Sequence, residues 1–276
     1  MKKIINFNNI FLIVTILIVG FSFVGCEKDP TLTENLPQKK IVNNPYDIFG
    51  QYHNEAMQII YDSAKTGKPI NISVFACDFT AHKMSINTHY DYKFWFDRFL
   101  PCMDLFNNQF LPFYKDFSDL DFSSNFFNSL TDYQRKYLCL IFRTMDTTNS
   151  ESEFFKSLKL IEQIVLTDVT APEWEKGVVL GTISIAKYSF AFVITHFPKD
   201  RAPRWLEKVK NVAKADAVGF VGGAIASVLD GHAAAATMTF GPQGTVAVVA
   251  GEATMGAIIN SGTVIVGEVV NQIVND

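Results

Sequence analysis

Residues 215–235 read ADAVGFVGGAIASVLDGHAAA and residues 247–262 read AVVAGEATMGAIINSG, and these two stretches decide the fold. Small side chains recur at every fourth position in the first stretch and at steps of three and four in the second. This spacing puts them on one helix face, where they allow two backbones to approach closely. The predicted packing seam consists of Ala215, Gly219, Gly223, Ser227, Gly231, Ala235, Ala247, Ala250, Thr254, Ala257 and Ser261.

A short break at residues 241–244, with the sequence GPQG, separates the two stretches. The pattern over residues 213–276 therefore predicts a helical hairpin. It resembles a glycine-zipper hairpin, a pattern seen in pore-forming bacteriocins, some toxins and some envelope proteins. Because each glycine lowers helix stability by about 1 kcal/mol relative to alanine, such helices need close packing or a membrane to form. The resemblance implies association with, or insertion into, membranes.

Acidic residues limit how this hairpin could enter a bilayer. Asp216 and Asp230 bracket 13 uncharged residues, Glu252 and Glu268 bracket 15, and no Lys or Arg follows Lys214. A carboxylate at the bilayer centre costs about 2.5–3.5 kcal/mol on insertion scales, and protonation lowers this cost. Asp230 and Glu252 are therefore candidate pH-sensitive acids. Two interpretations stay open: a hairpin that acid or a target membrane releases, and a hairpin packed permanently on the body.

The preceding body, residues 44–212, has the start signals of several helices. Asn44-Pro45 begins the first, and capping boxes begin three others at Thr131, Ser150 and Thr170. The stretch Ile70 to Cys77 is rich enough in β-branched residues for a short strand or an extended piece. We therefore predict helices near residues 44–64, 131–147, 151–167 and 172–196, and a shorter basic helix near 200–214.

The helix predicted at 172–196 is apolar on nearly every side, with Lys187 as the one charge between residues 177 and 194. This favours the central helix of a bundle over a membrane span. Residues 90–155 contain 19 aromatic residues in 66, and four phenylalanines from Phe106 to Phe117 fall on one helical face. We interpret these rings as a phenylalanine-rich core, the alternative being an aromatic groove for an apolar or sugar-like ligand.

The first 25 residues have the pattern of a secretory signal peptide, with Lys2 and Lys3 before an apolar run from Ile10 to Val24. The segment Phe23-Val24-Gly25-Cys26 resembles the lipobox of bacterial lipoproteins. This resemblance implies diacylglycerol on Cys26, residues 26–43 as a flexible tether, and the lipid membrane as partner. The alternative is a retained transmembrane helix. The acidic and basic residues at 27–29 resemble the surface-export signal of Bacteroidota lipoproteins, which implies a location in the cell envelope, at the outer membrane and its surface.

Composition and motifs exclude several other classes of function. The chain is acidic, with a net charge of −4, and lacks a basic face, which argues against nucleic acid as a partner. No catalytic, nucleotide-binding or zinc-binding motif is present, so we expect no catalytic residue, metal or cofactor, and an enzyme stays open as a third class of function. The cysteines allow one disulfide, which we expect between Cys77 and Cys102, and Cys139 is interpreted as a buried apolar residue.

Taken together, the sequence predicts a mainly α fold, a helical bundle with an appended Gly/Ala-rich helical hairpin. The function favoured is a membrane-anchored lipoprotein whose hairpin associates with or inserts into membranes, in the manner of a bacteriocin-like toxin. The alternative is a structural or binding envelope lipoprotein whose hairpin packs on the core or mediates self-association.

Overall fold

A computed structural model describes residues 43–105, 128–197, 205–229 and 247–267. Within these ranges the chain is helical and has no strand, so the predicted mainly α bundle is confirmed. The helices are α2 (Asp47–Lys65), α3 (Ile72–Asn87), α4 (Tyr92–Leu105), α5 (Asp132–Thr147), α6 (Glu151–Thr167), α7 (Glu173–His196) and α8 (Trp205–Leu229). Ala247–Gly267 forms a further helix, called here the C-terminal helix.

Two of the predicted capping signals begin helices as expected. The Thr131 side chain accepts a hydrogen bond from the backbone N–H of Gln134, the Gln134 side-chain oxygen accepts one from the backbone N–H of Thr131, and this box begins α5. Ser150 accepts from the N–H of Glu153 and begins α6. The third signal is wrong, because the N-cap of α7 is Pro172 and it makes no side-chain cap. Thr170 instead donates its hydroxyl hydrogen to Asp168.

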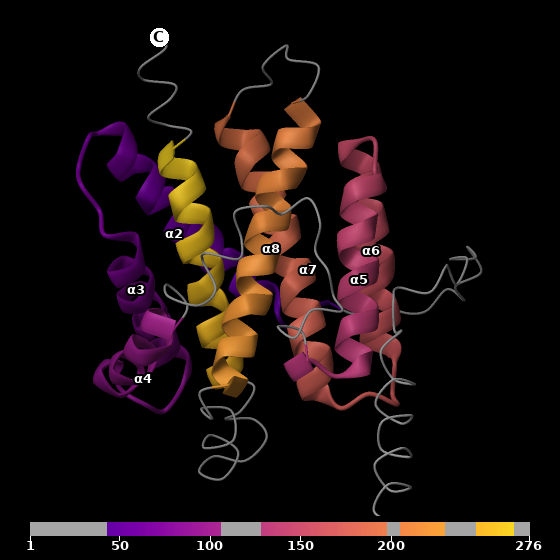
Figure 1. The fold of residues 1–276 in the computed structure, drawn as a ribbon, viewed down its shortest axis with the longest axis horizontal. Coiled ribbons are helices and arrows are strands. Elements are labelled where there is room, and N and C mark those ends of the chain that lie inside the picture. Colours follow the sequence, from indigo (N-terminus) through magenta and orange to yellow (C-terminus); the bar gives the residue numbers. More distant parts are fainter. Residues whose placement is uncertain (1–42, 106–127, 198–204, 230–246, 268–276) are drawn as a thin grey trace, which may run out of the picture.

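Three apolar helices, α7, α8 and the C-terminal helix, occupy the middle of the molecule (Figure 1). The C-terminal helix, drawn in yellow, lies beside α8, and α7 packs on α8. The indigo and purple helices α2, α3 and α4 cover one side of this centre, and the magenta pair α5 and α6 covers the other. The last helices of the chain therefore lie at the centre of the bundle, and helices from earlier in the chain cover them.

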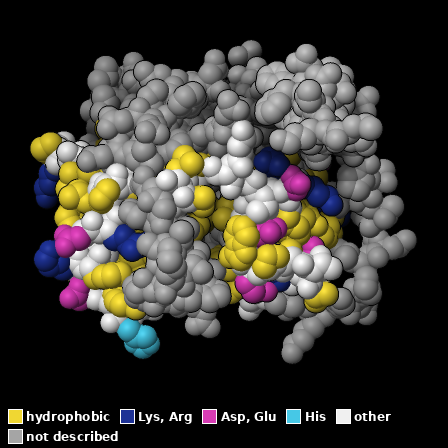
Figure 2. Space-filling view, turned by 60° about the horizontal axis from the view of Figure 1, so that its bottom comes forward, with side chains coloured by type: hydrophobic (Ala, Val, Ile, Leu, Met, Phe, Trp, Pro, Cys, Tyr) yellow, Lys and Arg dark blue, Asp and Glu magenta, His cyan; other side chains and the backbone are white. Residues whose placement is uncertain are grey.

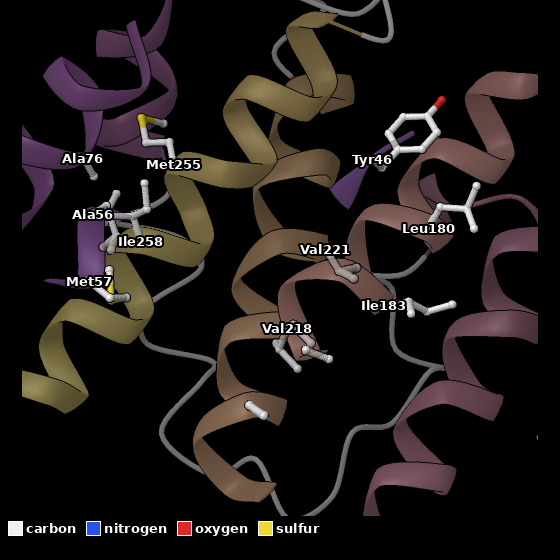
Figure 3. Close-up of a cluster of buried hydrophobic side chains, with 14 of the residues drawn as sticks. Tyr46, Ala56, Met57, Ala76, Leu180, Ile183, Val218, Val221, Met255 and Ile258 are labelled. Carbon is white, nitrogen blue, oxygen red and sulfur yellow. The ribbon is translucent and has the colours of Figure 1, made fainter. Parts of the chain in front are cut away.

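Buried aliphatic and sulfur-containing side chains connect the outer helices to this centre. Met255 and Ile258 of the C-terminal helix lie beside Ala56 and Met57 of α2 (Figure 3), and all four are fully buried. The face of α2 that enters the core repeats at helical spacing, and its buried residues are Gly50, His53, Ala56, Met57 and Ile60. Burial of an amphipathic face of this kind, rather than helix propensity, supplies most of a helix's stability.

Three expectations from the sequence are corrected. Ile70 to Cys77 is not a strand: Asn71 caps α3 through a hydrogen bond from the N–H of Val74. The predicted basic helix near 200–214 is not separate, because α8 runs without a break from Trp205 to Leu229 across the proposed boundary at residue 212. Cys77 and Cys102 are both buried and do not form the predicted disulfide with each other.

Further predictions concern Cys139 and the phenylalanines after α4. Cys139 is half-buried on α5 and disulfide-bonded, so its interpretation as a buried apolar residue is wrong. The phenylalanines between residues 106 and 117 lie outside the described residues, as do the signal peptide and the tether.

The surface of the described helices mixes charged and hydrophobic side chains (Figure 2). Exposed hydrophobic residues are scattered over several helices, and the most exposed are Val169 at 94% and Ile86 at 75%. Single exposed aliphatic residues are normal on water-soluble proteins. The outer helices thus have a surface of mixed charged and apolar side chains, and the apolar helices are enclosed.

Candidate functional site

The described residues include three helices that are long and apolar enough to cross a membrane. They are α7, α8 and the C-terminal helix, with 24, 25 and 21 residues. The most apolar window of each is largely buried inside the bundle, 78% for α7 and 83% for the other two. By composition these helices are compatible with membrane association, yet here they are enclosed by protein. The hairpin arms α8 and the C-terminal helix, with the residues that hold them, are the candidate functional site.

The two arms touch through glycine backbone at the positions predicted on α8. A Cβ atom at Gly219 would lie 2.8 Å from the carbonyl oxygen of Gly256, and one at Gly223 would lie 2.2 Å from the carbonyl oxygen of Glu252. Real Cβ atoms do not approach backbone this closely. Glycine is therefore required at both positions for the arms to pack at this distance.

On the C-terminal helix, most of the residues that contact Gly219 and Gly223 are not members of the predicted packing seam. Ala253 and Ala257 approach through their Cα atoms, and Asn260 donates a hydrogen bond of 2.5 Å to the carbonyl of Ala215. Ser261 contacts His53 of α2 and also interacts with Asp216 of α8. The side chain of Thr254 bonds to the carbonyl of Ala250 on its own helix.

The remaining predicted seam residues divide into two groups. Ser227 is buried, and its hydroxyl has no partner among the described residues; Ala247 is half-buried. Gly231, Ala235 and the candidate pH-sensitive Asp230 lie outside the described residues, as does Cys26. Glu252, the other candidate acid, is fully buried.

Other faces of the C-terminal helix contact the body of the bundle. A Cβ at Gly251 would lie 2.6 Å from the ring of Phe99 on α4. A Cβ at Gly262 would lie 2.7 Å from the γ2 carbon of Ile72 on α3 and 2.9 Å from Ile60 on α2. The glycines that did not belong to the predicted seam thus admit large side chains of the outer helices.

A buried polar cluster joins four helices at this site. The Nε2 atom of His53 on α2 lies 2.7 Å from Oγ of Ser261 on the C-terminal helix and 3.5 Å from Oδ2 of Asp216 on α8. Ser189 of α7 donates its hydroxyl hydrogen to the same oxygen of Asp216. All four residues are at most 1% exposed. The cluster is therefore a polar attachment of α2 that involves all three apolar helices.

Hydrogen-bond geometry assigns the tautomer of the histidine. The amide nitrogen of Asn54 donates to the carbonyl of Tyr188 at 2.8 Å, so its oxygen faces Nδ1 of His53 at 3.2 Å. Because that oxygen only accepts, Nδ1 carries the hydrogen and Nε2 is the acceptor. The Ser261 hydroxyl then donates to Nε2, and a protonated Asp216 can donate to Ser261.

Burial sets the charge states of this pair in opposite directions. Desolvation lowers the pKa of His53 from 6.5 to about 4, against a smaller raising effect of the Asn54 hydrogen bond. Desolvation raises the pKa of Asp216 from 3.8 to about 7, against smaller lowering effects of hydrogen bonds from Ser189 and Ser261. Both shifts favour the neutral form of each group, as expected for ionisable side chains removed from water.

The cluster contains the residue types of a Ser-His-Asp triad but not its geometry. In a triad the carboxylate orients Nδ1 and the serine meets Nε2. Here Ser261 and Asp216 both face Nε2, and Asn54 faces Nδ1. The side chains are also enclosed, which leaves no room for a substrate. The arrangement can hold helices together and hold or release a proton, but it is not built for acyl transfer.

Two lysines attach α8 to the outer helix α5. Lys214 donates to both carboxylate oxygens of Asp146 at 2.9 Å, and Lys210 donates to the carbonyls of Asp146 and Thr148. These carbonyls end α5, where the helix dipole favours a cation. Lys210 and Lys214 are buried, so these two members of the basic stretch do not form a solvated face. Lys187 of α7 is likewise paired, with Glu162 at 2.6 Å.

Sequence reasoning missed the cluster although one signal was present. His53 occupies a core position of the apolar face of α2, and a polar residue at such a position needs a buried partner. Asp216 in an apolar helix carries the same signal. Which residues meet could not be read, because their positions differ by up to 208 in the chain. Among the described residues, no three His, Cys, Asp or Glu side chains come together as a metal site would require.

No protein-family model, curated protein or solved structure matches this chain.

Proposed function

We propose that this protein is a lipid-anchored envelope protein that stores an apolar hairpin inside a water-soluble bundle and transfers it to a membrane. The observation that carries the proposal is the contact between α8 and the C-terminal helix. Gly219 and Gly223 of α8 lie against backbone of the C-terminal helix, so the two arms of the hairpin are in direct backbone contact with each other. Such a pair can leave the bundle as one unit and keep its small-residue contact in lipid, where packing drives helix association.

The enclosure of both arms supports the same proposal. Each is apolar enough to cross a membrane and is 83% buried in its most apolar window. In a bilayer, every backbone polar group must be satisfied internally, which two intact helices achieve. The buried acids Asp216 and Glu252 would enter as neutral groups or face each other across a self-associated assembly.

Anchoring belongs to the proposal as well. Cys26 follows a signal-like segment, and the acyl chains of a lipoprotein would keep the bundle on the envelope membrane. The expected consequence is that the protein fractionates with membranes and that Cys26→Ser moves it to the soluble fraction. Mass spectrometry of the mature chain gives an independent result. An unmodified amino end at Cys26 would remove the anchoring part of the proposal and leave the hairpin part standing.

Dye release from liposomes tests the hairpin part. We expect the purified chain to release a trapped fluorophore from lipid vesicles. The appropriate control is the same chain after chemical cross-linking, because cross-linked helices cannot separate. Absence of leakage between pH 4.5 and 7.5 would overturn the proposal.

A second function is favoured by a specific observation, the attachment of α8 by Lys210, Lys214 and the His53 cluster. These contacts suit a hairpin that never leaves, in a structural or binding lipoprotein whose C-terminal helix completes the core. The two functions differ in the leakage experiment, since a permanently packed hairpin releases nothing.

A further inference from the structure

His53 occupies a special place in the polar cluster. Asp216, Ser189 and Ser261 belong to the three apolar helices, whereas His53 belongs to α2, an amphipathic helix of the outer layer. When the hairpin leaves, His53 therefore stays behind with α2. Its imidazole exchanges a fully buried position for water, and this exchange changes its affinity for a proton.

Among the described residues, Asp216 is the titratable side chain in contact with His53. On α2, Glu55 pairs with Lys83 at the surface. On α7, Lys187 pairs with Glu162 and Asp47, and only the uncharged Ser189 joins the cluster. On α8, Lys214 pairs with Asp146. On the C-terminal helix, Ser261 and Asn260 are uncharged. Glu252 lies at the Gly223 contact, nine residues before Ser261 in the chain.

We propose that His53 is the proton acceptor that couples release of the hairpin to acid: α8 carries Asp216 into the bilayer as a neutral acid while His53, exposed on α2, takes up one proton from solution. The inference rests on the proposed function and specifies its regulation. It assigns the trigger to a residue of the outer layer, and not to Asp230 or Glu252.

The proton balance distinguishes release into a membrane from unfolding in water. The docked cluster holds one proton between about pH 4 and pH 7, on Asp216. An unfolded chain holds one proton between pH 3.8 and 6.5, on His53. Unfolding thus moves the proton from one residue to the other with almost no net uptake. Insertion keeps the proton on Asp216, because lipid disfavours the carboxylate, and adds one on His53.

The expected size of the effect follows from this balance. Below the ordinary pKa of histidine, uptake of one proton changes the insertion equilibrium by up to tenfold per pH unit. The ordinary pKa of 6.5 and the docked pKa of about 4 set the limits of this window. The same acidification should leave the contribution of the cluster to stability in water nearly unchanged. Acid therefore promotes insertion without first unfolding the bundle.

The experiment compares dye release at pH 6.5, 5.5 and 4.5 for the unaltered chain, His53→Gln and His89→Gln. Vesicles of phosphatidylcholine are used, because their head groups do not titrate in this range. His89 is an exposed histidine and serves as the matched control. Circular dichroism and urea unfolding at each pH establish that the variants are folded. We expect release to rise up to tenfold per pH unit for the unaltered chain and His89→Gln, and to be nearly independent of pH for His53→Gln.

The outcomes separate the two levels of the account. No release by any variant at any pH overturns the proposed function. Release by the unaltered chain that does not rise with acid, or a His53→Gln profile as steep as that of His89→Gln, overturns the role of His53 and leaves membrane insertion standing. Loss of the pH dependence in His53→Gln alone supports the inference.

Discussion

Gly223 of α8 lies so close to Glu252 of the C-terminal helix that a Cβ atom at position 223 would come within 2.2 Å of the Glu252 carbonyl oxygen. The contact is backbone against backbone, and no side-chain rotation can relieve it. The two arms of the hairpin are therefore held at a separation that only glycine permits.

The first prediction is that Gly223→Ala separates the arms. Forcing an extra methyl group into a packed core costs about 1–3 kcal/mol, and here the obstructing atoms belong to the main chain. Urea unfolding followed by circular dichroism measures the loss. Gly267→Ala is the control, because nothing lies within 4 Å of its added Cβ and alanine favours helix by about 1 kcal/mol. Equal stability of the two variants would contradict the packing described.

Much of this hairpin was readable from the sequence because its signal is local. The four-residue spacing of Gly219 and Gly223 defines one helix face whatever surrounds it, and the structure puts that face on the second arm. The capping signals at Thr131 and Ser150 succeeded for the same reason, since all their atoms lie within four residues.

The errors have a physical cause too. The stretch after Ile70 contains β-branched residues, but tertiary packing of Ala76 and Cys77 into the core overrides that weak propensity. The third predicted cap, at Thr170, failed because Pro172 begins the helix and the threonine bonds to Asp168 instead.

The candidate site was predicted only in part. Its glycines follow from the spacing, but the His53–Asp216 contact depends on how α2 lies across the finished bundle. Likewise, the sequence predicted a short basic helix before the hairpin but not its contacts, and Lys210 and Lys214 turn toward the end of α5. Long-range pairing of this kind leaves no periodic trace in one sequence.

The second prediction concerns that attachment of α8 to α5. Lys210→Met keeps the length of the side chain but removes the donor to the Asp146 and Thr148 carbonyls. Losing a buried hydrogen-bond partner costs about 1–3 kcal/mol, so urea unfolding should show a loss of this order. Lys208→Met, at an exposed position of the same helix, should change stability by less than about 0.5 kcal/mol. Similar values for both variants would show that the Lys210 contacts contribute nothing.

The third prediction tests the proton balance of the cluster in water. Asp216→Asn leaves His53 as the only titrating group of the cluster. Because burial lowers the pKa of His53, its contribution to stability is present above pH 6.5 and is lost as the pH falls toward 4. Each pH unit in this window changes the free energy by about 1.4 kcal/mol. We expect Asp216→Asn to lose roughly 2–3 kcal/mol, relative to the unaltered chain, between pH 6.5 and 4.5.

His53→Gln should give the same cluster a pH dependence of stability with the opposite sign. It leaves Asp216 alone, and because burial raises the pKa of Asp216, the contribution of this group is present below pH 3.8 and is lost as the pH rises through 7. Relative to the unaltered chain, this variant should lose stability between pH 4.5 and 7. Parallel urea-unfolding profiles for all three proteins would show that His53 and Asp216 do not compensate each other.

The most direct test of the central claim is a reversible lock on the hairpin. The γ2 carbon of Ile72 lies 2.7 Å from the Cβ position of residue 262, so Ile72→Cys combined with Gly262→Cys brings two thiols within disulfide reach. The oxidised double variant ties the C-terminal helix to α3. Gly262→Cys alone is the control for the substitution itself.

Dye release from liposomes by this double variant, before and after reduction, is the decisive measurement. If the hairpin must leave the bundle, the oxidised form releases nothing above background, and reduction restores release to the level of Gly262→Cys alone. Equal release by the oxidised and reduced forms would contradict the account, because leakage would then arise with the hairpin still in place.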